Sequence, residues 1–204
     1  TSFDVVKKIR NTVRQKKVGH AGTLDPLATG LLLIAIGKYT KKLNDLQLLD
    51  KSYEGVLEIG KTTPSYDLET EFDSESSIEN IRPEDLHKAT DAFKGKIEQY
   101  PPSYSAIKNK GERAYVKARK GEKVELKSRT VHIQDFKIDI ENIPDIAFEV
   151  KCSKGTYIRS LANDFGQKLG CGAYLKKLRR TAIGDFKLED AYELEDFIKI
   201  FKEQ

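Results

Sequence analysis

Two periodicities in the pattern of apolar and polar residues predict the elements of this chain. Spacing of three and four residues predicts an N-terminal helix that buries Val5, Val6, Ile9 and Val13 and that Ser2 can cap. The same spacing predicts four later helices: one from Pro83 to before Gly95, a short one over 112–119, one with Leu161, Phe165 and Leu169 on one face, and a closing one with Leu194, Phe197, Ile198 and Phe201 inward.

Alternation with a period of two predicts strands between these helices. Residues 51–59 place Tyr53, Leu57 and Ile59 on one face and both glutamates on the other. In residues 131–140, apolar and polar residues alternate in two segments of opposite parity, which predicts a β-bulge near Gln134 and Asp135. Apolar and polar residues alternate again over 146–152, which predicts a further strand. The continuous apolar run 31–36 is typical of a strand buried on both faces.

Residues 18–30 form a polar loop ahead of that apolar run. Three glycines and one proline exclude a regular helix or strand here, and Pro26 biases Asp25 toward extended backbone. A surface turn is the commoner interpretation of such a pattern. A single acid on a loop beside a buried strand is, however, also how rigid scaffolds present reactive groups.

Length and composition narrow the class of protein. A chain of 204 residues makes one medium domain, or a domain with a small appendage, and is long enough to bury a substantial core. It has no apolar run of membrane-spanning length and no signal-peptide pattern. Its two cysteines form no Cys-x-x-Cys pair, and its three histidines lack metal-ligand spacing. We therefore expect a reduced, cytoplasmic protein without a metal site.

The charge is distributed unevenly, although the chain as a whole carries only +4. Between Asp67 and Asp91 there are nine acidic residues against Arg82 and Lys88, a net charge of −7, so the rest of the chain is strongly basic. Basic residues cluster at 14–17, 38–42, 117–120 and 176–180. Such clusters are usually solvated surface, but four of them favour a polyanionic partner.

Residues 55–62 (GVLEIGKT) match the P-loop expression for nucleotide binding. A P-loop is a glycine-rich turn that opens a helix, whereas the middle of this segment alternates as a strand and Pro64 follows it. We therefore reject an ATP site.

Several segments together resemble one family. The segment 19–30 (GHAGTLDPLATG) resembles the catalytic motif of the TruB family, bacterial synthases that make pseudouridine-55 in the T loop of tRNA. Segments 99–108 (QYPPSYSAIK), 153–159 (SKGTYIR) and 173–186 (AYLKKLRRTAIGDF) also resemble that family. The resemblance covers most of the chain.

This resemblance implies an α+β pseudouridine synthase fold, with a mixed, mostly antiparallel sheet and flanking helices. Residues 1–204 would be the catalytic domain, with a thumb-like insertion at about 99–130 that closes on RNA. TruB-type proteins carry a strand just before the segment that begins here at Thr1, and often a small C-terminal RNA-binding domain. We expect that strand to be missing from this sequence, and no C-terminal domain of the usual size.

The resemblance also implies the site. Asp25 would be the catalytic nucleophile or base, and Arg159 would pair with it. Tyr53 and Tyr157 would stack on or hydrogen-bond the uracil, and Leu178 would form an apolar wall. A further match, His20, would fill the space that the flipped uridine leaves.

Isomerisation of uridine needs one group near C1′ or C2′ and a closed pocket for the free uracil, so the implied enzyme uses no cofactor and no metal. Its partner would be the T arm of tRNA, and we expect a monomer that contacts no membrane. Two alternatives remain open: a non-catalytic tRNA-binding or RNA-folding module, and an RNA-guided pseudouridine synthase subunit that needs protein partners.

Overall fold

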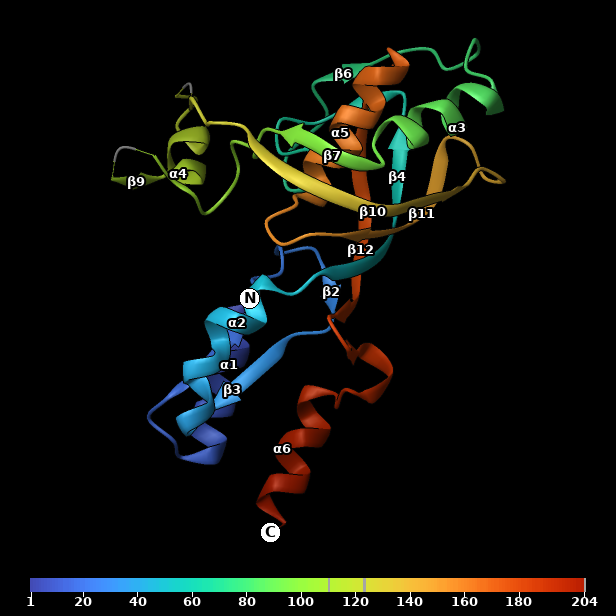
Figure 1. The fold of residues 1–204 in the computed structure, drawn as a ribbon. Helices are drawn as coiled ribbons and strands as arrows, with labels where there is room; N and C mark the ends of the chain where they lie inside the picture. The colour runs from blue at the N-terminus through green and yellow to red at the C-terminus, as the bar shows by residue number, and fades with distance from the viewer. Residues whose placement is uncertain (110, 123, 204) are drawn as a thin grey trace. The chain divides into compact units, whose positions relative to one another are not determined.

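The computed structural model describes residues 1–109, 111–122 and 124–203. They form two compact units, one of residues 1–53 and 179–204 and the other of residues 54–178 (Figure 1). The divisions fall within two long strands, β4 (Lys51–Ile59) and β12 (Ala173–Ile183), so each of these strands belongs in part to both units.

The second unit is built on a sheet in the order β12-β4-β11-β10-β7. Strand β10 (Arg129–Asp139) is antiparallel to β11 (Asp145–Cys152) on one side and to β7 (Gly95–Gln99) on the other. The register between β10 and β11 shifts between Ile133 and Asp135, which confirms the predicted bulge, although the strand continues through it.

Two helices cover one side of this sheet. Helix α3 (Pro83–Ala92) packs against β10 and against α5 (Ile158–Leu169), and Figure 1 shows both helices on the same side of β10. The core beneath them is aromatic: Phe136 meets Phe148 and Phe165 edge to face, at centroid distances of 6.1 and 6.0 Å. Both helices lie where the sequence pattern predicts them.

Shorter elements complete the second unit. Strand β5 (Lys61–Thr62) follows β4 and pairs with β6 (Ser74–Glu75), so the P-loop-like segment is strand, as its alternation predicts, and not a turn that opens a helix. Strands β8 (Lys108–Asn109) and β9 (Glu112–Arg113) and helix α4 (Ala114–Arg119) lie within the predicted insertion. In Figure 1, β9 and α4 extend away from the sheet beyond one end of β10.

The first unit packs helices around a small sheet. Helix α1 (Ser2–Val13) contacts α6 (Leu194–Lys202) and β1 (Val18–Ala21), and β1 is antiparallel to β3 (Leu33–Ile36). The short η1 (Gly37–Lys42) and α2 (Leu43–Leu48) follow β3. The C-terminal end of β12 pairs with two short strands: in parallel with β2 (Thr29–Gly30) and antiparallel with β13 (Phe186–Lys187). After β13, the short η2 (Leu188–Asp190) precedes α6.

Three predictions for elements of the first unit need correction. The N-cap of α1 is Thr1, not Ser2, because the Thr1 and Asp4 side chains form a reciprocal capping box. Segment 31–36 is not a strand buried on both faces: β3 begins at Leu33, and Ala35 alone in it is fully buried. In α6, Phe197 is half-buried as predicted, but Phe201 is 41% exposed.

A fourth correction concerns β4. The alternation places Glu58 on the polar face, yet it is only 7% exposed. Tyr174 and Lys176 donate to its Oε2 over 2.7 and 3.0 Å, so the charge is buried with partners. Burial favours the neutral form of Glu58, but these hydrogen bonds outweigh it and lower the pKa of the carboxyl.

Candidate active site

The prediction that residues 18–30 contain no regular strand is wrong at both ends, because Val18–Ala21 form β1 and Thr29–Gly30 form β2. The glycine-rich loop that remains between β1 and β3 is held in one shape by its surroundings. Gly22 and Gly30 have φ of +91° and +98°, values that favour glycine. The backbone N–H of Leu24 donates to Ser2 Oγ over 3.0 Å, which explains why Ser2 is buried and is not the helix cap. A tight turn brings Ala28 N within 3.0 Å of Asp25 O.

Arg180 is the central support of this loop. Its guanidinium donates from Nε to Leu31 O over 2.8 Å and from Nη2 to Gly22 O over 3.0 Å, so it spans both ends of the loop. Its own carbonyl accepts from Leu31 N over 2.8 Å. The side chain is 1% exposed, and a Cβ on Gly30 would lie only 2.3 Å from Arg180 O. Arg180 is therefore part of the loop's scaffold and not of a phosphate-binding surface.

Asp25 lies in the turn at the tip of this loop. It is half-buried and lines a cavity of about 1090 Å³ that is formed by residues of the first unit alone. The walls are largely apolar and come from α1, β3 and α6, with Arg179 and Asp185 among the polar lining residues. The loop thus presents a carboxylate to a hollow large enough for a nucleotide-sized group.

His20 precedes this loop on β1. Its Nδ1 is buried and has no hydrogen-bond partner among the described residues. Burial lowers the pKa of the imidazole, a hydrogen bond to the backbone of Gly22 acts in the opposite direction, and the charge of Arg180 lowers it further. The ring is therefore neutral at pH 7. Tyr53 is half-buried, at the end of the first unit's part of β4.

The second unit positions Tyr157 through its backbone. Gln99 is fully buried and clamps this residue from both sides: its Oε1 accepts from Tyr157 N over 2.8 Å and its Nε2 donates to Tyr157 O over 3.0 Å. The guanidinium of Arg129 lies 5.0 Å from the centroid of the Tyr157 ring. Tyr157 is also the N-cap of α5, so the helix start and the ring are fixed together.

Arg159 lies in the first turn of α5 and is 2% exposed. Its Nη1 lies 3.5 Å from Asp67 Oδ2 and donates to Ser65 O over 3.2 Å, and its Nη2 donates to Tyr104 O over 3.1 Å. Asp67 in turn accepts from Glu69 N over 3.0 Å. Within its unit, Arg159 is thus oriented by two segments far from it in the sequence, residues 65–67 and Tyr104. Leu178, the last site candidate, is 8% exposed on β12.

Sequence reasoning missed Gln99, Asp67 and the structural role of Arg180. Strand alternation could have found Arg180, because it shares the parity of the apolar Leu178 on β12. Asp67 stands in a run of acidic residues, and nothing in the sequence marks it as a partner for an arginine 92 positions later. The predicted pairing of Arg159 with Asp25 joins residues of different units and stays a prediction.

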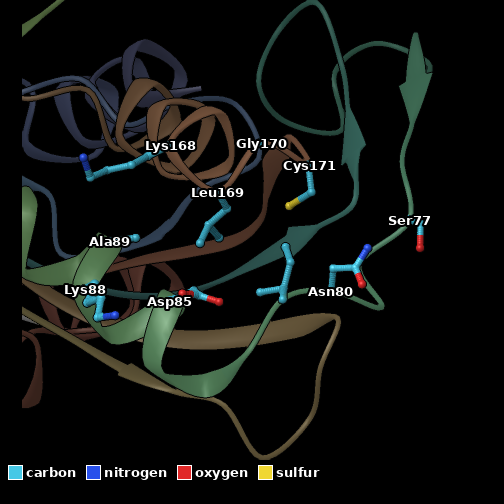
Figure 2. Close-up of a pocket in the computed structure, with 10 residues that line it drawn as sticks. Ser77, Asn80, Asp85, Lys88, Ala89, Lys168, Leu169, Gly170 and Cys171 are labelled. Atoms are coloured by element: carbon cyan, nitrogen blue, oxygen red, sulfur yellow. The ribbon is translucent and has the colours of Figure 1, made fainter.

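A second cavity, of about 520 Å³, lies in the second unit at the C-terminal end of α5 (Figure 2). Figure 2 shows Asp85 and Lys88 on one side and Leu169 and Cys171 on the other. The Cys171 thiol donates to Gly172 O over 3.3 Å, and burial raises its pKa, so it is no activated nucleophile. None of the predicted site residues lines this cavity.

The residues that the structure describes form neither a metal-ligand cluster nor a membrane-spanning helix. Within the described ranges, no group of three or more His, Cys, Asp or Glu side chains is arranged to hold a metal ion. Nor does any helix in those ranges have the length and apolar character needed to cross a membrane.

Comparison with known proteins defines the class. The family model "TruB family pseudouridylate synthase (N terminal domain)" matches residues 10–158, and "tRNA pseudouridylate synthase B C-terminal domain" matches residues 159–204. The fold is that of the pseudouridine synthases, a mixed α+β arrangement with a mostly antiparallel sheet, as predicted. The chain belongs to the TruB family.

Individual relatives agree with this assignment. The chain is 49% identical over 201 residues to tRNA pseudouridine synthase B of Flavobacterium johnsoniae, covering 95% of this chain and 88% of that protein. It is 50% identical over 203 residues to the protein of the same name from Phocaeicola vulgatus, covering 97% and 86%.

Solved structures resemble it more distantly. A chain of a Cbf5-Nop10-Gar1 complex matches with a TM-score of 0.75 and 28% identity over 98% of this chain. A chain of an H/ACA RNP bound to a substrate RNA containing 2′-deoxyuridine matches with a TM-score of 0.72 and 26% identity. The present chain spans about half the length of each, 50% and 51%.

Proposed function

We propose that this protein is a tRNA pseudouridine synthase that isomerises uridine-55 in the T loop, with Asp25 acting as nucleophile or base. The reaction breaks the N1–C1′ bond, turns the uracil and joins C5 to C1′, so that no atom is gained or lost. A carboxylate can serve by attack at the anomeric carbon or by proton abstraction at C2′.

The observation that carries this proposal is the position of Asp25. It is held in a turn of a loop that Arg180 and Ser2 fix from separate elements, and it lines a cavity of about 1090 Å³. Catalytic groups need such fixed placement, because a misplacement of about 1 Å can cost roughly 10²-fold in rate. The names of its relatives support tRNA as the substrate.

The remaining site candidates receive roles in the same proposal. Tyr53 and Tyr157 hold the uracil, Leu178 forms an apolar wall beside it, and Arg159 keeps Asp25 ionised and oriented. His20 fills the space that the flipped uridine leaves, a role supported by its neutral ring and by a buried Nδ1 that has no hydrogen-bond partner among the described residues.

Two alternatives are less well supported. Against a synthase subunit that works only within a larger assembly, identity to the chains of the Cbf5-Nop10-Gar1 complex and of the H/ACA RNP is 28% and 26%, whereas identity to the two synthases named above is 49% and 50%. A non-catalytic tRNA-binding module would have no need of a carboxylate held at the tip of a fixed loop. We propose that the enzyme acts alone, as a monomer in the cytoplasm, where its buried thiols Cys152 and Cys171 stay reduced.

Substitution Asp25→Asn tests the proposal. We expect it to abolish formation of pseudouridine in an unmodified T-arm transcript, while the affinity for tRNA changes by less than about fivefold, or about 1 kcal/mol. The matched control is Asp45→Asn, an exposed carboxylate on α2 of the same unit, which should retain full activity. Turnover by Asp25→Asn at a tenth of the unaltered rate would remove Asp25 from the chemistry, and modification only at another uridine would remove the T-loop assignment.

A further inference from the structure

Two basic segments of the first unit adjoin next to Tyr39. Two segments lie side by side there: the turn after α1 and η1, joined where Gly37 N donates to Lys17 O over 2.8 Å. The pairing of Val18 with Ile36 fixes this neighbourhood. We name it the Tyr39 patch, and it contains six cations: Arg14, Lys16, Lys17, Lys38, Lys41 and Lys42.

The charges of this patch are uncompensated. All six cations are exposed, and within the part of the chain that the structure describes none of them forms an ion pair. Segments 14–17 and 37–42 contain no acidic residue. Six unpaired cations repel one another, and so many in one place favour a polyanion.

Tyr39 gives the patch a second kind of contact. Its side chain is 58% exposed, and Lys38 Nζ and Lys42 Nζ each lie 5.8 Å from the ring centroid. An exposed ring beside cations is the arrangement with which proteins hold unpaired nucleotides: the base stacks on the ring while the ammonium groups meet its phosphates. An acidic peptide would satisfy the lysines but would leave the ring without a partner of matching shape.

We propose that the Tyr39 patch is a docking surface for the substrate RNA, where lysines bind the phosphate backbone and Tyr39 stacks on an unpaired base outside the target nucleotide. The proposal rests on RNA being the substrate, which is part of the proposed function. It does not depend on the chemistry assigned to Asp25, because the patch lies on η1 and the turn after α1 and not in the glycine-rich loop.

The two contacts have different signatures in a binding experiment. Filter binding of an unmodified tRNA transcript is measured over a range of salt concentrations, with all variants made in the Asp25→Asn background so that no product forms. The double substitution Lys16→Gln/Lys17→Gln should lower the slope of log affinity against log salt by about 1.4 to 1.8. Substitution Tyr39→Leu should weaken binding about 5- to 50-fold with the slope unchanged, and Tyr39→Phe should bind normally.

The double substitution Lys199→Gln/Lys202→Gln removes two exposed lysines of α6 in the same unit and should leave affinity and slope unchanged. If the Lys16/Lys17 and Tyr39 variants also bind as the parent does, the patch is not a docking surface. Loss in the lysine variant alone would overturn the stacking role of Tyr39. If the protein with Asp25 intact forms no pseudouridine, the proposed function fails, while the binding comparison still decides the patch.

Discussion

The basic cluster at 176–180 and the Tyr39 patch have similar composition, but they differ in how far their basic side chains are buried and paired. On β12, alternate side chains point inward: Lys176 is half-buried, Leu178 and Arg180 are buried, and Lys177 between them is exposed. Lys176 Nζ meets Glu58 Oε2 at 3.0 Å and Asp145 Oδ1 at 2.8 Å, and Arg180 holds the glycine-rich loop. In the Tyr39 patch every cation faces solvent.

The difference follows from backbone geometry. A strand that is packed on one face sends every second side chain inside, so a run of basic residues on it must include cations that need buried partners. A 3-10 turn and a loop at the surface impose no such requirement. On a strand, only about half of the cations counted in the sequence are therefore exposed and able to bind phosphates. In a surface turn, the count of cations in the sequence equals the count of exposed cations.

The largest effect is expected from Arg180→Met. Methionine retains the apolar length of the side chain but leaves the carbonyls of Gly22 and Leu31 without their donor, which should cost about 2–5 kcal/mol in the free energy of unfolding. The released loop should also lower the single-turnover rate by roughly 10²-fold. Denaturant unfolding and rapid-quench kinetics measure the two effects.

Two controls separate loop placement from general instability. Substitution Arg180→Lys keeps the positive charge but replaces the guanidinium by a single ammonium group. It should therefore show smaller losses than Arg180→Met in both the free energy of unfolding and the single-turnover rate. Substitution Lys177→Met changes an exposed neighbour and should leave both unchanged. If Arg180→Met has the normal rate under conditions where it is folded, the loop does not depend on this arginine for its active shape.

The sequence pattern predicts this fold well where periodicity is clean. Helices α1, α3 and α5, strand β4 and the bulge in β10 all lie where the pattern places them. The pattern fails where tertiary contacts decide, as at Glu58, which is buried because Tyr174 and Lys176, more than a hundred residues away, supply its partners. The pattern also fails at Ser2, which it predicts as a helix cap, because the Ser2 hydroxyl accepts a hydrogen bond from Leu24 N and does not cap the helix.

The candidate site shows the same limit. Its residues come from the resemblance of local motifs, which name Asp25, Tyr157 and Arg159 but not the groups that hold them. Gln99 clamps Tyr157 from 58 residues away, and Asp67 meets Arg159 from another loop. Such supporting contacts depend on the packed chain and have no local signature.

A second, smaller effect is expected from Gly30→Ala. A Cβ there would lie 2.3 Å from Arg180 O and 2.7 Å from Arg180 N, at a φ of +98°, so the β2–β12 pairing must open. We expect a loss of about 2–3 kcal/mol in stability. Substitution Gly37→Ala is the matched control: its φ is +61° and nothing lies within 4 Å, so it should cost only about 1 kcal/mol. Equal losses in the two variants would mean that the contact with Arg180 contributes nothing.

The smallest effect is expected from Lys176→Met, which removes the cation shared by Glu58 and Asp145. Tyr174 still donates to Glu58, so the loss at pH 7 should be about 1–3 kcal/mol. The pKa of Glu58 is lowered in the folded protein, so its ionised form contributes stability above its ordinary value of 4.5, and this contribution is lost as pH falls.

The raised pKa of Lys176 acts at the other end of the pH range: its contribution is full below the ordinary value of 10.5 and is lost only as pH rises through the folded pKa. The deficit of Lys176→Met relative to the unaltered protein should therefore be constant between about pH 5 and 10 and should shrink below pH 4.5. Urea unfolding at a series of pH values measures this, with Lys177→Met as the control that shows no deficit. A deficit that persists unchanged at pH 3 would mean that Lys176 stabilises the strand through packing of its alkyl chain and not through Glu58 and Asp145.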